Sequence, residues 1–144
     1  MGRGMSAEIR LMEFVRDELG RPFEWGETNC LALALRAMDA MHGTNLHATH
    51  RHRMTSAARA QAGTRKHGIK GVMMFLQQHG LTALTLNYAQ EGDILLGLTD
   101  DGQIAAHVSL GNRVLSSTQA DGVILMRLAT VSPAPTLAAG WRST

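Results

Sequence analysis

Residues 21–42 read RPFEWGETNCLALALRAMDAMH, a polar loop with two aromatic residues followed by an almost wholly apolar run. The run from Cys30 to Met41 is rich in Leu, Ala and Met, which favour helix, and Gly43 supplies a stop. Its charged positions are Arg36 and Asp39. A helix with so few polar positions is expected to run through the middle of a domain, buried on most sides.

The single cysteine of the chain, Cys30, opens this predicted helix, with Thr28 or Asn29 available as the N-cap. Helix N-termini carry unpaired N–H groups and a partial positive charge, which favour a thiolate over a thiol. Cys30 is therefore a candidate nucleophile, although one cysteine near the start of an apolar helix is also a common small core residue. A single thiol excludes an intramolecular disulfide.

Predicted helices come first along the chain and predicted strands follow. Helical periodicity predicts a helix that begins after Ser6 and ends at Gly20, and an amphipathic helix from Ile69 to His79. Short alternating runs between turn residues then predict strands at Thr82–Leu86, Asp93–Leu98, Gln103–Leu110, Arg113–Ser117 and Val123–Leu128. This order indicates an α+β domain with N-terminal helices packed on a C-terminal antiparallel sheet.

The length of 144 residues and the hydrophobic content of 44% predict a single domain over residues 1–144. Two prolines near residue 133 mark the start of an expected C-terminal tail, residues 132–144. No apolar run approaches the roughly 20 residues that span a bilayer, and the first residues lack the apolar stretch of a signal peptide. We therefore expect a protein without a membrane span that starts in the cytoplasm.

The segment 44–67 is expected to be a basic, histidine-rich insertion or loop. No Asp or Glu occurs between Asp39 and Glu91, whereas six Lys and Arg residues do. Such a block favours a solvated face or contact with an acidic partner. The sequence argues against nucleic acid as a partner, because no aromatic residue lies between Trp25 and Phe75 to stack on bases.

Four of the seven histidines lie in this segment, which raises a metal site as a weaker alternative. His47, His50 and His52 fall within six residues, and His42 or His67 could complete a ligand shell. Two arginines interleave these ligands and no carboxylate or cysteine is near, so the residues themselves favour a polar loop without metal.

A cysteine nucleophile needs a base, and His107 is the histidine that falls inside the predicted strand region. A helix that crosses a sheet brings residues as distant as Cys30 and His107 together. A third polar group should orient the imidazole, and the candidates on the adjoining strand are Ser116, Ser117 and Gln119. A histidine on a strand is also commonly a hydrogen-bonded structural residue.

Four short motifs occur in order along the chain. They are Pro22-Phe23-Glu24-Trp25-Gly26, then Asn29-Cys30, then Glu91-Gly92-Asp93-Ile94-Leu95, and then His107-Val108 leading to Leu110-Gly111-Asn112. In this order they resemble the NlpC-type cell-wall peptidases, and more narrowly the tail-associated bacteriophage and prophage members of that group. The resemblance covers about residues 8–142 and includes Trp141-Arg142, which is similar to the close of the phage subgroup.

The resemblance implies a papain-like fold in which Cys30 is the nucleophile and His107 the general base. Trp25 would form a wall beside the thiol, and Asn29 stands where the family commonly has Asp. The activity implied is hydrolysis of amide bonds in the peptide stems of peptidoglycan, with no cofactor. The implied partners are other phage tail proteins, and the implied location is the host cytoplasm during assembly and then the virion tail.

The third catalytic residue implied by the resemblance is Ser116 if a two-residue shortening lies in the turn after the His107 strand. Simple counting gives Gln119 instead. Neither side chain stabilises an imidazolium as a carboxylate would. The alternative to a peptidase is therefore a catalytically weak or inactive papain-fold component of a phage tail tip.

Overall fold

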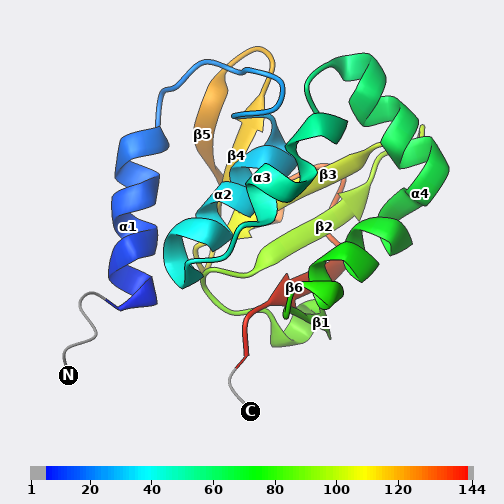
Figure 1. Cartoon of the computed structure of the whole chain (residues 1–144). Coiled ribbons are helices and arrows are strands. Elements are labelled where there is room, and N and C mark those ends of the chain that lie inside the picture. The colour runs from blue at the N-terminus through cyan, green and yellow to red at the C-terminus, as the bar shows by residue number, and fades with distance from the viewer. Residues whose placement is uncertain (1–5, 143–144) are drawn as a thin grey trace.

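The computed structural model describes residues 6–142, apart from the side chains of residues 63–67. The helices precede the strands in the chain, with the β6 strand close to its end (Figure 1). The helices are α1 (Ala7–Glu18), α2 (Cys30–His42), α3 (Leu46–His50) and α4 (Ala57–Gln78). The strands are β1 (Thr82–Thr85), β2 (Ile94–Leu98), β3 (Ile104–Ser109), β4 (Arg113–Thr118), β5 (Gly122–Arg127) and β6 (Leu137–Gly140). The α+β class predicted from the sequence is confirmed.

The six strands form one antiparallel sheet in the order β1-β6-β2-β3-β4-β5. Its β6 strand corrects one expectation, because part of the segment 132–144 is an internal strand and not a tail. Leu137 and its neighbours pair with β1 on one side and with β2 on the other. The five predicted strands lie within two residues of the observed ones.

Helix boundaries follow the signals in the sequence. The Ser6 hydroxyl accepts the N–H of Ile9 at 3.3 Å and caps α1. Gly43 ends α2 with a φ of 70°, in the left-handed conformation that glycine adopts without steric cost. These two devices fix the start of α1 and the end of α2, two of the four described helices.

Helix α2 lies across the middle of the sheet, as its composition predicts (Figure 1). Seven of its thirteen residues are buried. They pack with apolar residues of α1, α3 and α4 and with one face of β2, β3 and β4, including Leu33, Met38, Ile94, Val108 and Leu115. A smaller apolar cluster with Leu95 and Val114 covers the other face. Successive strand residues point to opposite faces, so β2, β4, β5 and β6 contribute alternate residues to the two clusters.

The segment 44–67 is not a loop, which corrects the expectation from its composition. It contains α3, a short 3-10 helix (Arg51–Arg53) and the beginning of α4. Leu46 and Met54 are buried in the main core, and the Asp39 carboxylate accepts the N–H groups of Leu46 and His47 at 2.8 and 3.0 Å. Anchoring by these residues gives the basic segment a fixed structure.

A buried carboxylate ties α1 to α2. Glu18 is 5% exposed and accepts two hydrogen bonds from Arg36, at 2.6 and 2.9 Å, and two from Arg21 at 3.0 Å. Burial by itself favours the neutral acid, but the two guanidinium groups outweigh it and hold the pKa of Glu18 below its usual value. The pair positions α2, and with it the loop that leads into Cys30.

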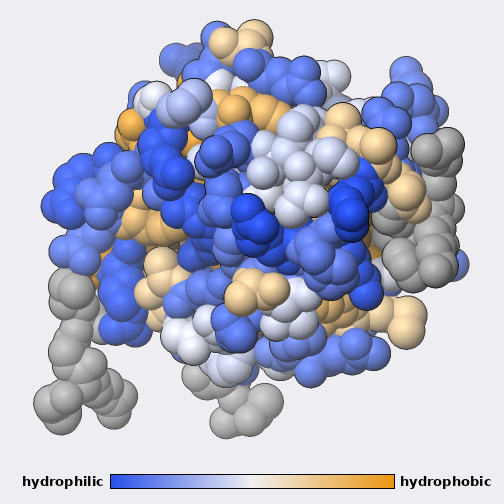
Figure 2. Space-filling view, turned by 45° about the horizontal axis from the view of Figure 1, so that its top comes forward, coloured by the Kyte–Doolittle hydropathy of each residue, from blue (hydrophilic) through white to orange (hydrophobic). Residues whose placement is uncertain are grey.

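No helix in the described part of the chain is long and apolar enough to cross a membrane. The face in Figure 2 is mostly hydrophilic, and its apolar residues occur in separate patches. Large apolar side chains that are exposed include Ile9 and Met12 of α1 and Met74 of α4.

Candidate functional site

The Cys30 sulfur lies where the start of α2 meets the edge of β3. The N–H of Ala106 donates to the sulfur at 3.5 Å, and the thiol lies 3.9 Å from the carbonyl oxygen of Ile104. Strand β3 pairs with β4 only through its last two residues, Val108 with Leu115 and Ser109 with Val114. The upstream edge of β3 is therefore available to the thiol.

The loop before α2 is held by its own polar groups. The Thr28 hydroxyl donates to the carbonyl of Pro22 and accepts the N–H of Glu24, both at 2.7 Å. Asn29 occupies the N-cap position, but its side chain makes no capping bond to the helix and accepts the N–H of Gly26 at 2.8 Å instead. The buried amide thus shapes the loop beside the thiol, which differs from the capping role expected from the sequence.

The environment of the thiol also differs from the expectation based on the helix N-terminus. Burial raises the pKa of the Cys30 thiol, and the N–H groups of Ala106, Leu31 and Cys30 itself offset this only in part. The resting group at neutral pH is therefore the thiol, which is a weaker nucleophile than the thiolate.

His107 is buried on β3, and its Nδ1 lies 2.8 Å from the Ser116 hydroxyl on β4. Its Nε2 is buried and has no hydrogen-bond partner among the described groups. Burial lowers the pKa of His107 to about 4, so the imidazole is neutral at pH 7.

The register of the sheet directs His107 away from α2. His107 pairs with Leu95, which belongs to the apolar cluster on the far face, whereas its neighbour Ala106 belongs to the core beneath α2. The thiol therefore contacts β3 at Ala106, the residue next to His107, and among the described residues no hydrogen bond joins it to the imidazole.

The two candidates for the third residue lie in different surroundings. Ser116 contacts the imidazole, whereas Gln119 is exposed in the turn between β4 and β5. Ser116 is the residue of the two that can orient His107 in this arrangement.

A pocket of about 140 Å³ opens beside Cys30. Trp25 lines the pocket and is half-buried, and its ring is in edge-to-face contact with that of Phe23, with the ring centroids 4.9 Å apart. Asn29 also lines it. The pocket is mostly apolar, with a few polar side chains, which is the usual character of a small-ligand site.

Two lining residues have places that the sequence did not predict, and one of them is Ser117, which the sequence offered only as a possible partner of His107. Ser117 projects to the α2 face because it pairs with Val123, a residue of the main core. Alternation along β4 was the signal, since Ser116 and Ser117 must point to opposite faces. Arg53 reaches the pocket from the short helix after α3. Its part in the site could not be read from the basic composition of the segment.

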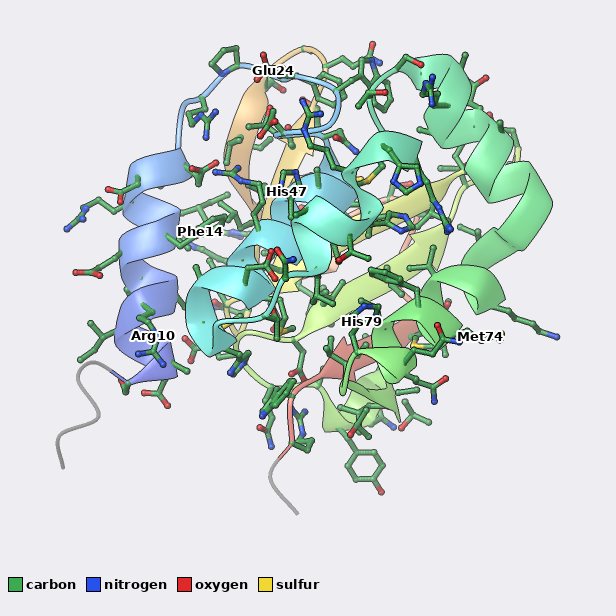
Figure 3. All side chains as sticks on the ribbon, in the orientation of Figure 1. Arg10, Phe14, Glu24, His47, Met74 and His79 are labelled. Atoms are coloured by element: carbon green, nitrogen blue, oxygen red, sulfur yellow. The ribbon has the colours of Figure 1, made fainter. Side chains whose placement is uncertain are left out.

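The histidines of the weaker metal hypothesis do not converge. His47 lies between α3 and the loop before α2, with its Nε2 2.6 Å from the Gly26 carbonyl (Figure 3). His50 is buried, and the centroid of its ring lies 4.6 Å from that of the Phe75 ring. His52 is exposed. Over the described residues, no group of three or more His, Cys, Asp and Glu side chains is arranged to hold a metal ion. The side chain of His67 falls outside the described residues.

Fold and site together define an α+β protein with a helix-start cysteine held against β3, an internal strand of its antiparallel sheet. Residues 3–136 match the model of a protein family described as a domain of unknown function (DUF6950), and the chain belongs to this family. The curated proteins contain no match to the chain.

Proposed function

We propose that this chain is an NlpC-type, papain-like cysteine peptidase of a bacteriophage tail that hydrolyses amide bonds in peptidoglycan peptide stems. The observation that carries the proposal is the contact of the Cys30 sulfur with β3 at Ala106, one residue from His107. The imidazole is in turn bonded to Ser116. The order of the four sequence motifs supports the peptidoglycan substrate and the phage setting.

In the proposed reaction the Cys30 sulfur attacks the amide carbonyl carbon while His107 accepts the thiol proton. The imidazolium then protonates the leaving amine, which leaves a thioester on Cys30. Water, deprotonated by His107, hydrolyses the thioester and restores the thiol. The N–H of Cys30, at the N-terminal end of α2, faces the developing oxyanion.

The resting thiol and imidazole are both neutral, so proton transfer takes place during attack and not before it. Because His107 is directed to the far face of β3, transfer also requires the β3 edge to rearrange when substrate binds. The unpartnered Nε2 is the nitrogen that receives the proton. These requirements predict a slow enzyme.

Replacing Cys30 by Ala is expected to reduce peptidoglycan hydrolysis by at least about 10³-fold, because the nucleophile is lost. The measurement is release of soluble peptide fragments from purified peptidoglycan, with thermal unfolding used to check that the variant is folded. As Cys30 is the single cysteine, iodoacetamide treatment of the wild-type protein serves as a matched control and should abolish the same activity. Identical fragment profiles for all three samples would contradict the proposal.

A second candidate is a catalytically inactive structural component of the tail tip. It is favoured by the neutral thiol and by the absence of a Cys30–His107 hydrogen bond among the described residues. This function predicts that phage particles carrying Cys30→Ala assemble and infect at wild-type titre, whereas deletion of the gene prevents assembly. A loss of infectivity by assembled Cys30→Ala particles would instead favour the peptidase.

A further inference from the structure

The pocket beside Cys30 has an uneven distribution of charge. Among the residues whose side chains are described, Arg53 is the one Arg or Lys in the lining, and no Asp or Glu contributes to it. The neighbouring Arg51 donates to Glu27 at 2.8 Å, whereas no ion pair joins Arg53 to any described carboxylate. An uncompensated guanidinium at a mostly apolar pocket favours an anionic ligand.

Ser117 supplies an independent indication of a ligand. It is 8% exposed, lines the pocket, and its hydroxyl oxygen has no hydrogen-bond partner among the described groups. A buried hydroxyl without a partner is unfavourable, and a ligand oxygen in the pocket would satisfy it. Ser117 and Arg53 both carry hydrogen-bond donors, and both residues line the cavity that Cys30 also lines.

The size of the pocket limits the ligand to a small group. A volume of about 140 Å³ is close to that of cavities that hold a molecule the size of benzene. A single small amino-acid residue fits within this volume, whereas a bulky side chain does not. Apolar walls, which include Trp25 and Ile104, suit the carbon atoms of such a residue.

We propose that the Cys30 pocket binds a small residue that carries a free carboxylate, with Arg53 pairing with the carboxylate and Ser117 donating to an oxygen of the ligand. The inference rests on the proposed function in treating that residue as part of the substrate beside the nucleophile. Arg53 is then a specificity-determining residue that selects peptides with a free carboxylate next to the reacting amide.

The test uses alkylation of Cys30 by two reagents of similar size, the anion iodoacetate and the neutral iodoacetamide. The ratio of their rates at pH 9 measures the preference of the pocket for a carboxylate. In Arg53→Gln this ratio is expected to fall about fivefold, because the local cation is lost. Arg59→Gln is the matched control, since Arg59 lies in the same basic segment outside the lining and should change the ratio less than about twofold. An unchanged ratio in Arg53→Gln, or an equal fall in both variants, would overturn the proposal.

Protection experiments distinguish the source of the carboxylate. N-acetyl-alanine carries a terminal carboxylate, N-acetylglutamic acid α-amide a side-chain carboxylate, and N-acetyl-alanine amide none. Slower iodoacetamide labelling with one of the acids and not with the amide supports the carboxylate site and identifies the source. Equal labelling with all three would overturn it. Because alkylation requires no turnover, a protein that shows the charge preference but hydrolyses no peptidoglycan refutes the peptidase function alone.

Discussion

Replacing Gly140 by Ala is expected to lower the free energy of unfolding by about 4 kcal/mol, although the change adds a single methyl group. A Cβ on Gly140 would overlap Asp93 Oδ1 and lie 2.6 Å from Asp93 Cγ and 2.8 Å from Arg142 Nη1. The Asp93 carboxylate is nearly buried and accepts hydrogen bonds from Arg142 at 2.6 and 2.9 Å. It also accepts the N–H of Gln90 at 2.7 Å. The added methyl therefore breaks a buried ion pair and forces the end of β6 away from β2.

The measurement is equilibrium unfolding in urea, with Gly111→Ala as the matched control. Gly111 has a φ of 90° and nothing within 4 Å of an added Cβ, so its replacement costs only backbone strain of about 1 kcal/mol. If both variants unfold at the same urea concentration, the Asp93–Arg142 pair and the end of β6 accommodate the methyl group without the expected loss of stability, and the prediction is wrong. An insoluble Gly140→Ala protein beside a soluble Gly111→Ala protein would agree with the expected loss.

The same strand shows why part of the sheet escaped sequence-based prediction. Strands β2 to β5 contain β-branched residues, leucines and marked turns, whereas β6 consists of Leu137, two alanines and Gly140. Small residues carry little strand signal, and the prolines before them indicate a linker. The strand pairs with β1 and β2 all the same, and its small residues suit their surroundings, because Ala138 and Ala139 are fully buried and a Cβ on Gly140 would overlap Asp93. These requirements arise from tertiary packing.

The basic segment after α2 shows a different limit. Its charges and histidines predict a solvated loop, and four of the six such side chains that the structure describes are exposed. Two isolated apolar residues, Leu46 and Met54, nevertheless enter the core. Their spacing matches no single helix or strand, because α3 and a 3-10 helix change the direction of the chain between them. Periodicity is informative only within a continuous element.

For the candidate site, the sequence located the elements but not the directions of the side chains. The predicted Cys30 helix start and His107 strand are both present and adjacent. Alternation along β3 was available as a further signal, since Ala106 and Val108 are the apolar residues that should face the helices. His107 between them must then face the far side. Desolvation, which governs the pKa of both groups, depends on packing around them and has no local signal in the sequence.

Burial of His107 predicts a marked acid sensitivity of folding. The pKa of His107 is about 4 in the folded protein, against an ordinary value of 6.5. Below pH 6.5 the unfolded chain binds a proton that the folded protein does not, so stability falls as the pH decreases toward 4 and levels off below it. Between pH 7 and pH 5 this one group is expected to remove about 2 kcal/mol of unfolding free energy.

Comparison of variants isolates this contribution from that of the other titrating groups. His107→Gln keeps a polar side chain beside Ser116 but has no proton to gain, so its loss of stability from pH 7 to pH 5 should be smaller by about 2 kcal/mol. Ser116→Ala keeps the buried imidazole and should retain the wild-type pH dependence, because burial and not the hydroxyl lowers the pKa. Urea unfolding at the two pH values provides the measurement. Two results would contradict this prediction: a wild-type pH dependence in His107→Gln, or an NMR titration of His107 near pH 6.5. Either result would mean that the imidazole is solvated. A solvated imidazole would also be free to serve Cys30 as a base at neutral pH.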